Sequence, residues 1–257
     1  MVIGGIKRIA SVSQIIVPFM AVIYVVAALV LIIANIENVP GAFVEIFEGA
    51  FGVKPIAGGV LASIAIAMQK GVARGIFSNE SGLGSAPIAA AAAQTNEPVR
   101  QGLVSMTGTF IDTIIICTMT GLSIVMMGTW ADKSLEGVQV TTAAWQKGLY
   151  FLPGDVASFI LMICLVFFAF TTILGWNYYG ERCLEYLFNG SKGAVKVYRW
   201  LYILAVFIGP YMTVAAVWTI ADIFNGLMAI PNIIALFALG GVVAKDTREY
   251  LKKNKEL

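Results

Sequence analysis

The sequence predicts an all-α integral membrane protein, and two observations carry this prediction. Apolar residues make up 59% of the 257 residues and charged residues only 12%, where a soluble domain has about a quarter of its residues charged. The apolar residues also gather in long runs, and about 20 such residues form a helix that crosses a hydrocarbon core of roughly 30 Å. These runs are too long and too uniformly apolar for the short alternating strands of a membrane β-barrel.

The runs predict six membrane crossings within a single transmembrane domain, residues 1–257. They lie at residues 12–34, 55–95, 101–127, 156–179, 198–218 and 223–244. The first run is long enough to span and lacks the short core and cleavage site of a secretory signal, so no cleavable signal is expected.

Basic residues in the short loops predict the orientation. If every run crosses once, one side holds most of the lysines and arginines, and the other holds only Lys54, Lys133 and Lys147. We therefore expect both chain ends to face the cytoplasm in a multi-pass protein of the inner (plasma) membrane. The basic residues follow membrane topology and form no single patch, so the net charge of +2 does not indicate a nucleic-acid partner.

Two outer loops contain apolar residues at helical spacing. The loop at residues 36–54 includes "PGAFVEIFEGAFG" and the loop at residues 129–155 includes "TTAAWQKGLYFLPGD". Each predicts a short helix lying at the membrane interface. Such helices either gate an extracellular mouth or only anchor the loop.

The second run is interrupted by "KGVARGIFSNESGLGSAP", residues 70–87. A continuous helix over residues 55–95 would measure roughly 60 Å, twice the hydrocarbon thickness. We therefore expect two half-helices, residues 56–68 and 86–93, with at least residues 71–79 forming a polar break at membrane depth. Breaks of this kind build the binding sites of secondary transporters. The alternative is a cytoplasmic loop followed by an amphipathic helix.

Asp112 lies roughly 18 Å along the third run from Arg100, near mid-membrane. An ionisable residue at that depth is a candidate functional residue. The competing interpretation is a structural ion pair with Lys70 or Arg74.

The fourth run contains the adjacent hydroxyls of Thr171 and Thr172, followed one turn later by Trp176 and Asn177. Hydroxyl and carbonyl oxygens are the ligands that hard alkali cations prefer. The competing interpretation is that each threonine bonds back to a carbonyl of its own helix.

Several other classes of protein are disfavoured. The chain contains no histidine, which excludes the usual serine protease arrangement, so no enzyme is expected. Its three cysteines, Cys117, Cys164 and Cys183, lack metal-site spacing and are interpreted as small buried hydrophobic residues. An ion channel would need a continuous polar lining, which the last three runs do not offer. A nonconducting scaffold is the remaining structural alternative.

Three stretches resemble the signature of the alanine or glycine:cation symporter family, the sodium:alanine symporters. They are "GVARGIFSNESGLGSAPIAAAAAQT", "PVRQGLVSMTGTFIDTIIICTMTGL" and "TTILGWNYYGERCLEYLF". The resemblance begins with "GGIKRIASVSQIIVPFMAVIY" and extends over essentially the whole chain.

The resemblance implies a leucine-transporter-like fold of two inverted five-helix repeats, with this chain supplying the fifth to tenth spans. It implies that the protein moves alanine or glycine inward with Na⁺. By the same match, the substrate is contacted by Gly75, Ile76, Phe77, Ser78 and Asn79, with Phe77 as an apolar lid. Thr171 and Thr172 resemble a sodium site, and Trp176 would line the substrate pocket.

The chain also departs from the family pattern, because family members carry four further spans before its first residue. We therefore expect a C-terminal portion whose partner is the N-terminal half of the transporter. Alanine, glycine and D-amino acids stay open as substrates. Proton coupling stays open as well, although Na⁺ is favoured because no titratable residue stands out as perturbed.

Overall fold

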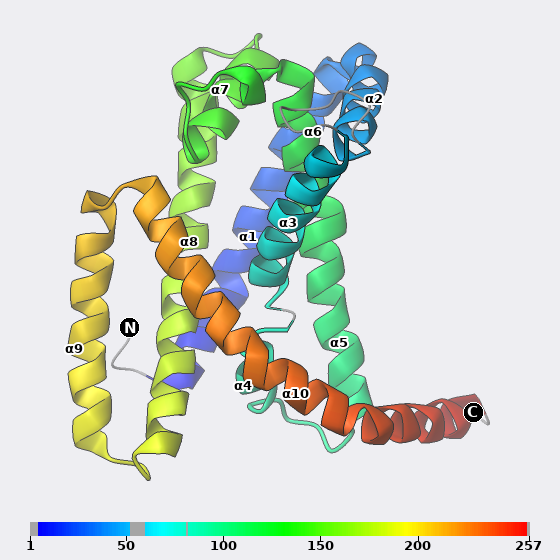
Figure 1. Ribbon diagram of the computed structural model, residues 1–257. Helices are drawn as coiled ribbons and strands as arrows, with labels where there is room; N and C mark the ends of the chain where they lie inside the picture. Colours follow the sequence, from blue (N-terminus) through cyan, green and yellow to red (C-terminus); the bar gives the residue numbers. More distant parts are fainter. Residues whose placement is uncertain (1–4, 52–59, 81, 256–257) are drawn as a thin grey trace. The chain divides into compact units, whose positions relative to one another are not determined.

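The computed structural model describes residues 5–51, 60–80 and 82–255, which are helical and contain no strand (Figure 1). The helices are α1 (Gly5–Ala34), α2 (Val39–Ala50), α3 (Val60–Asn79), α4 (Ala86–Ala90), α5 (Pro98–Phe110), α6 (Thr118–Met127), α7 (Val138–Gly148), α8 (Gly154–Leu187), α9 (Lys192–Ile208) and α10 (Val214–Lys255). A π-helical segment, Ile111–Cys117, joins α5 to α6. The predicted all-α class is confirmed.

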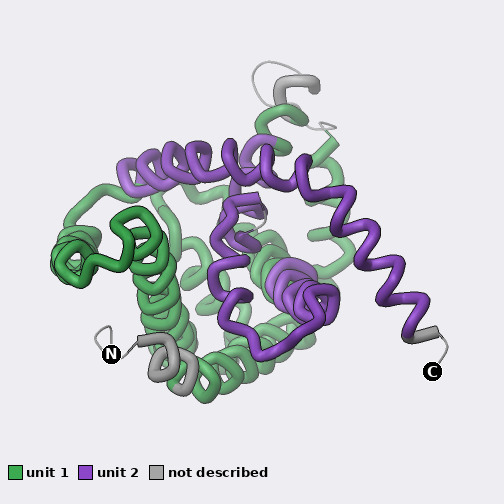
Figure 2. Tube along the Cα trace, turned by 90° about the horizontal axis from the view of Figure 1, so that it is seen from below, with its two compact units in different colours: residues 1–68, 116–214 green, residues 69–115, 215–257 purple. Residues whose placement is uncertain are grey.

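The chain divides into two compact units (Figure 2). Unit 1 comprises residues 1–68 and 116–214, and unit 2 comprises residues 69–115 and 215–257. Each unit therefore combines segments that lie far apart in the sequence.

In unit 1 the helix α1 packs against α6, α7 and α8, while α9 packs along α8. The centre of this packing is Tyr24, whose ring lies 5.2 Å from that of Trp145 and 6.2 Å from that of Phe168. The Thr120 hydroxyl donates to the Ile116 carbonyl, so the Tyr24 hydroxyl donates to Thr120, at 2.5 Å. The hydroxyl groups of Tyr24 and Thr120 are thus both paired within unit 1.

Asn35 ties the end of α1 to α7. Its side-chain amide donates to the carbonyls of Leu31 and Gly148, both at 2.8 Å. These carbonyls belong to the last turns of their helices, which lack partners within the helix. One side chain therefore satisfies two helix ends.

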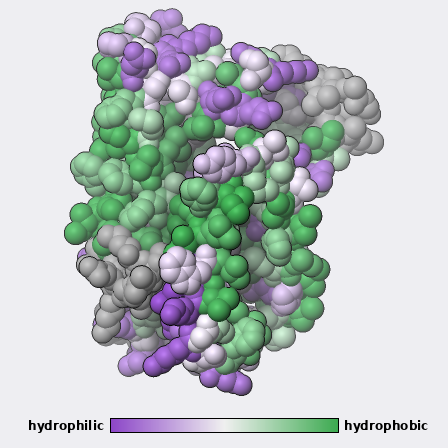
Figure 3. Space-filling model, turned by 90° about the vertical axis from the view of Figure 1, so that its left-hand side faces the viewer, coloured by the Kyte–Doolittle hydropathy of each residue, from purple (hydrophilic) through white to green (hydrophobic). Residues whose placement is uncertain are grey.

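Four helical stretches in the described part of the chain are long and apolar enough to cross a membrane. They are Val12–Ala34, Pro98–Met127, Gly154–Leu187 and Val214–Lys253. Large apolar side chains on them are exposed, among them Val22 and Phe237, and hydrophobic residues cover much of the face in Figure 3. Exposed apolar surface of this extent is typical of a lipid-facing protein.

The prediction that residues 71–79 are broken was wrong. Helix α3 runs without interruption through Gly71 and Gly75 to Asn79. The break follows it, where Glu80, Gly82 and Gly84 have φ of 53°, 88° and 78°. A helical glycine costs only about 1 kcal/mol relative to alanine, which the hydrogen bonds of a helix in a dry environment outweigh.

The expected half-helices also differ in length from those observed. The start of the first, residues 56–59, lies outside the described residues. The second, expected over residues 86–93, is the five-residue helix α4, Ala86–Ala90.

The predicted fifth crossing, residues 198–218, contains the end of α9 and the start of α10. Helix α9 ends at Ile208 and a 3₁₀ turn follows at Gly209–Tyr211. Pro210 explains this stop, because proline has no backbone N–H and its ring clashes with the preceding turn of a helix. The two predicted loop helices are present as α2 and α7.

We predict that Gly148→Ala destabilises unit 1. A Cβ atom at Gly148 would lie 2.7 Å from Cγ of Leu31, which is fully buried and has no room to move. Overpacking of this kind costs about 1–3 kcal/mol, so the thermal unfolding temperature of the full-length protein in detergent should fall. Gly121→Ala in α6 is the matched control, because a Cβ there meets no atom within 4 Å. Equal unfolding temperatures for the two variants would contradict the prediction.

Candidate functional site

Unit 2 gathers polar side chains where α3 ends, and we call this set the α3 cluster. Its members come from α3, from the π-helical segment and from the start of α10. They are Arg74, Phe77, Ser78, Asn79, Asp112, Thr113, Trp218 and Asp222.

Two parallel hydrogen bonds join α3 to the π-helical segment. The Ser78 hydroxyl donates to Oδ2 of Asp112 at 2.5 Å, and the Thr113 hydroxyl donates to Oδ1 of Asn79 at 2.8 Å. Consecutive residues of one helix thus bond consecutive residues of the other. Asp112 lies in the first turn of the π segment, and such wide turns are common at functional sites.

Arg74 joins α3 to α10. Its guanidinium donates to both carboxylate oxygens of Asp222, at 2.7 and 3.2 Å, and its Cζ lies 3.8 Å from the ring centroid of Trp218. The Phe77 ring contacts the Trp218 ring edge-on, with the two ring centroids 5.9 Å apart. A charge pair and a cation–π contact therefore hold the same guanidinium.

The competing interpretation of Asp112 was wrong. Asp112 accepts from Ser78, while Arg74 pairs with Asp222 and Lys70 is exposed. Sequence reasoning missed Trp218 and Asp222, which it placed at a span end and in a loop. The sequence did contain a signal for them, because Trp218 and Asp222 are one helical turn apart and Asp222 is an acidic residue within an apolar run.

The break after α3 contains two buried oxygens without a hydrogen-bond partner among the described residues, Oε2 of Glu80 and Oγ of Ser85. The backbone of Gly84 lies directly against Asn232 of α10, since a Cβ there would come 3.1 Å from the amide oxygen. Its positive φ and this close approach both require glycine. Gly75 and Ile76 are half-buried on α3, within the last two turns before the break.

In unit 1 the predicted residues of the fourth run lie on α8. The Thr171 hydroxyl donates back to the carbonyls of Phe167 and Phe168, at 3.0 and 3.1 Å. This bond to its own helix is the alternative to a cation site that the sequence left open. The Thr171 oxygen keeps lone pairs for a cation. Thr172 is the next residue along and is exposed. Successive residues of a helix lie about 100° apart around its axis, so the two threonine side chains leave α8 in different directions.

Trp176 and Asn177 have different surroundings. The Trp176 ring contacts the Tyr179 ring edge-on at 5.8 Å. Asn177 is fully buried and donates to Glu181 of the same helix at 2.7 Å, and Glu181 in turn accepts from Arg199 of α9.

Comparison with known proteins decides the family. The sodium:alanine symporter family model matches residues 1–257. The chain belongs to the sodium:alanine symporter family. It is accordingly a multi-pass membrane protein of a transporter family and not an enzyme.

Relatives match along nearly all of the chain. It is 54% identical to an uncharacterized transporter of Haemophilus influenzae and 48% identical to the sodium/alanine symporter AgcS of Methanococcus maripaludis, in both cases over 99% of this chain and 55% of the relative. It is 36% identical to a sodium/proton-dependent alanine carrier protein of Bacillus sp. strain PS3, over 99% of this chain and 60% of the relative. The chain thus spans little more than half the length of these relatives.

We predict a measurable coupling energy between Arg74 and Asp222 in a double-mutant cycle of Arg74→Gln and Asp222→Asn. Their side chains are 35% and 43% exposed, which limits the expected coupling to about 1 kcal/mol. The measurement is thermal unfolding of the purified full-length protein in detergent.

The control cycle uses Lys245→Gln and Glu249→Gln, whose charges lie 3.9 Å apart and are 74% and 67% exposed. It should give a coupling near zero. Equal couplings for the two pairs would show that the bidentate contact in the α3 cluster adds no stability.

Proposed function

We propose that the full-length symporter carries small neutral amino acids, alanine or glycine, into the cell together with Na⁺. The observation that carries this proposal is the match of the sodium:alanine symporter family model to all 257 residues. Because the chain spans little more than half of its relatives, we assign transport to the whole protein and parts of each site to this chain.

The proposal includes the leucine-transporter-like fold, with this chain as six spans of the inverted-repeat bundle and both of its ends in the cytoplasm. The break that follows α3, with positive φ at Glu80, Gly82 and Gly84, supports it, because a broken helix is the usual building block of a transporter's binding site. Rocking of one helix group against the other would alternate access to that site.

We assign the substrate to the end of α3, at Gly75, Ile76, Phe77, Ser78 and Asn79, with Trp176 as a further lining residue. The α3 cluster supports this assignment. It combines a hydroxyl, an amide and an arginine with the flat aromatic surface of Phe77 and Trp218. Polar groups of this kind suit a zwitterion, and the aromatic rings suit a small apolar side chain.

We assign the Na⁺ to Thr171 and Thr172 on α8. The Thr171 oxygen keeps its lone pairs for a ligand because this hydroxyl uses only its hydrogen in the bonds back to α8, and the Thr172 side chain is exposed. Binding of Na⁺ would raise the affinity for the amino acid by the same factor by which the amino acid raises the affinity for Na⁺.

Proton coupling is the second candidate function. It is favoured by Asp112, the carboxylate that accepts from Ser78 in the α3 cluster, and by the similarity to the Bacillus relative, a sodium/proton-dependent alanine carrier protein. A carboxylate that exchanges a proton beside the substrate would couple transport without Na⁺.

The first test is binding of radiolabelled L-alanine to the full-length symporter in detergent, in Na⁺ and in K⁺, for wild type and Thr172→Ala. We expect binding that needs Na⁺, and a Na⁺ affinity at least about tenfold weaker in the variant, comparable to the loss of a supporting group in other metal sites. Thr142→Ala on the loop helix α7 is the control and should bind normally. Binding that is indifferent to Na⁺ but lost in Asp112→Asn would establish the proton alternative instead.

The second test concerns the aromatic lid. We expect Phe77→Ala to weaken alanine binding about tenfold and to admit larger side chains, because truncating an apolar pocket wall costs about 1–3 kcal/mol. The measurement is competition of L-alanine, L-valine and L-leucine against the radiolabel. Phe110→Ala on α5 removes an exposed ring and should leave the ranking unchanged. An unchanged ranking in Phe77→Ala as well would exclude Phe77 from the pocket.

A further inference from the structure

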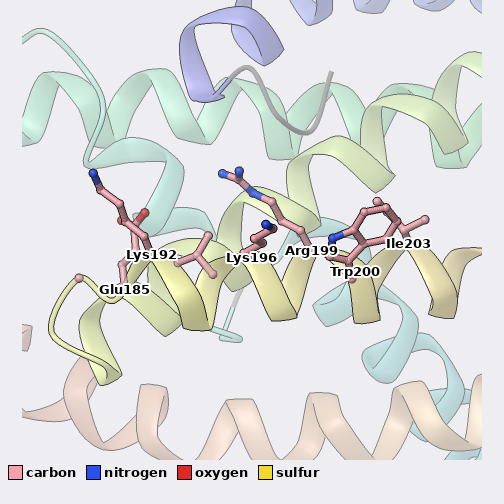
Figure 4. A pocket seen from close by; sticks show the side chains of 8 residues that line it. Glu185, Lys192, Lys196, Arg199, Trp200 and Ile203 are labelled. Atoms are coloured by element: carbon pink, nitrogen blue, oxygen red, sulfur yellow. The ribbon is translucent and has the colours of Figure 1, made fainter.

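The hairpin of α8 and α9 contains a pocket of about 490 Å³ that the transport function does not use (Figure 4). It lies entirely within unit 1, near the loop that joins the two helices. Its lining residues are Glu185, Gly190, Lys192, Val195, Lys196, Arg199, Trp200 and Ile203.

The backbone of the hairpin is well fixed. Gly190, with φ of 78°, donates its N–H to the Glu185 carbonyl at 2.7 Å, which closes the end of α8. The Ser191 hydroxyl then accepts from the N–H of Ala194 and caps α9. The positive end of the α9 dipole therefore points toward the pocket mouth beside Lys192.

The carboxylates around the pocket are already neutralised by arginines. Glu185 pairs with Arg182 at 2.6 Å, and Glu181 forms two bonds with Arg199, at 2.6 and 2.7 Å. Lys192 and Lys196 have no ion-pair partner within the described residues, and both are exposed. The pocket thus keeps an excess of two positive charges.

The same face of α9 turns apolar one helical turn further on. Lys192, Lys196, Trp200 and Ile203 follow one another along the helix at intervals of about one turn, as Figure 4 shows. Trp200 and Ile203 are 66% and 45% exposed. From Lys196 to Ile203 the helix rises roughly 10 Å, a distance comparable to that from a lipid phosphate to the upper acyl chain.

We propose that this pocket binds an anionic phospholipid. Lys192 and Lys196 hold its phosphate, and its acyl chain lies along Trp200 and Ile203. A soluble phosphate would leave the exposed apolar half of the pocket unused, and a zwitterionic lipid would leave the two lysine charges uncompensated. Basic pockets between membrane helices are known to recognise anionic headgroups in this way.

The test measures quenching of Trp200 fluorescence by brominated lipids. The full-length symporter is placed in phosphatidylcholine vesicles that contain a minor fraction of either brominated phosphatidylglycerol or brominated phosphatidylcholine. The difference between wild type and Trp200→Phe isolates the Trp200 signal. We expect stronger quenching by the phosphatidylglycerol, and an apparent affinity roughly fivefold weaker for each lysine removed in Lys192→Gln and Lys196→Gln.

Three controls separate the possible causes. Lys192→Arg with Lys196→Arg keeps the charge and should keep the preference. Lys245→Gln with Lys252→Gln removes the same charge from α10 and should leave the preference unchanged. Glycerol phosphate added in solution should not relieve the quenching.

Two results would overturn the proposal. Equal quenching by the two brominated lipids would show ordinary lipid contact without recognition of charge. Absence of quenching by either lipid would show that protein covers Trp200. Neither result bears on the Na⁺ and alanine sites, so the test of the lipid site is independent of the test of the transport function.

Discussion

The structure depends on one constraint, which is that polar groups in a membrane must find partners inside the protein. Hydroxyl groups in both units donate back to carbonyls of their own helices, as Thr171 does to Phe167 and Thr120 to Ile116 in unit 1, and as Thr219 does to Ala215 in unit 2. Such bonds let polar residues occupy apolar helices without leaving donors unsatisfied.

The same constraint explains why irregular backbone occurs in a few defined places. Unit 2 contains both a positive-φ break after α3 and a π-helical turn before α6, and the bond from Ser78 to Asp112 links the last turn of α3, just before the break, to the π-helical turn. Each irregularity frees backbone groups that a regular helix would consume. Bringing two irregular segments together supplies those groups to one site, which is how transporter sites in membranes are commonly built.

The sequence predicted long apolar helices well, because their length and composition follow directly from bilayer thickness. It also predicted α2 and α7 from helical spacing. It misplaced the break because the small penalty of Gly71 and Gly75 is outweighed by helical hydrogen bonds. The partner of Arg74 was not predictable, since Asp222 lies 148 residues away and several acids were available. The π-helical turn around Asp112 has no local sequence pattern that we could recognise.

In the hairpin of α8 and α9, arginine and lysine side chains have different roles. The side chain of Glu181 is only 4% exposed, so its charge needs a partner, and the planar fork of Arg199 engages both of its oxygens. Removing one member of such a buried pair leaves a charge without compensation. Lysine is a flexible point charge and suits the other role, with its stem on apolar surface and its ammonium group at the headgroups. Arg199 thus stabilises the contact of the two helices, and the lysines remain available to the proposed lipid.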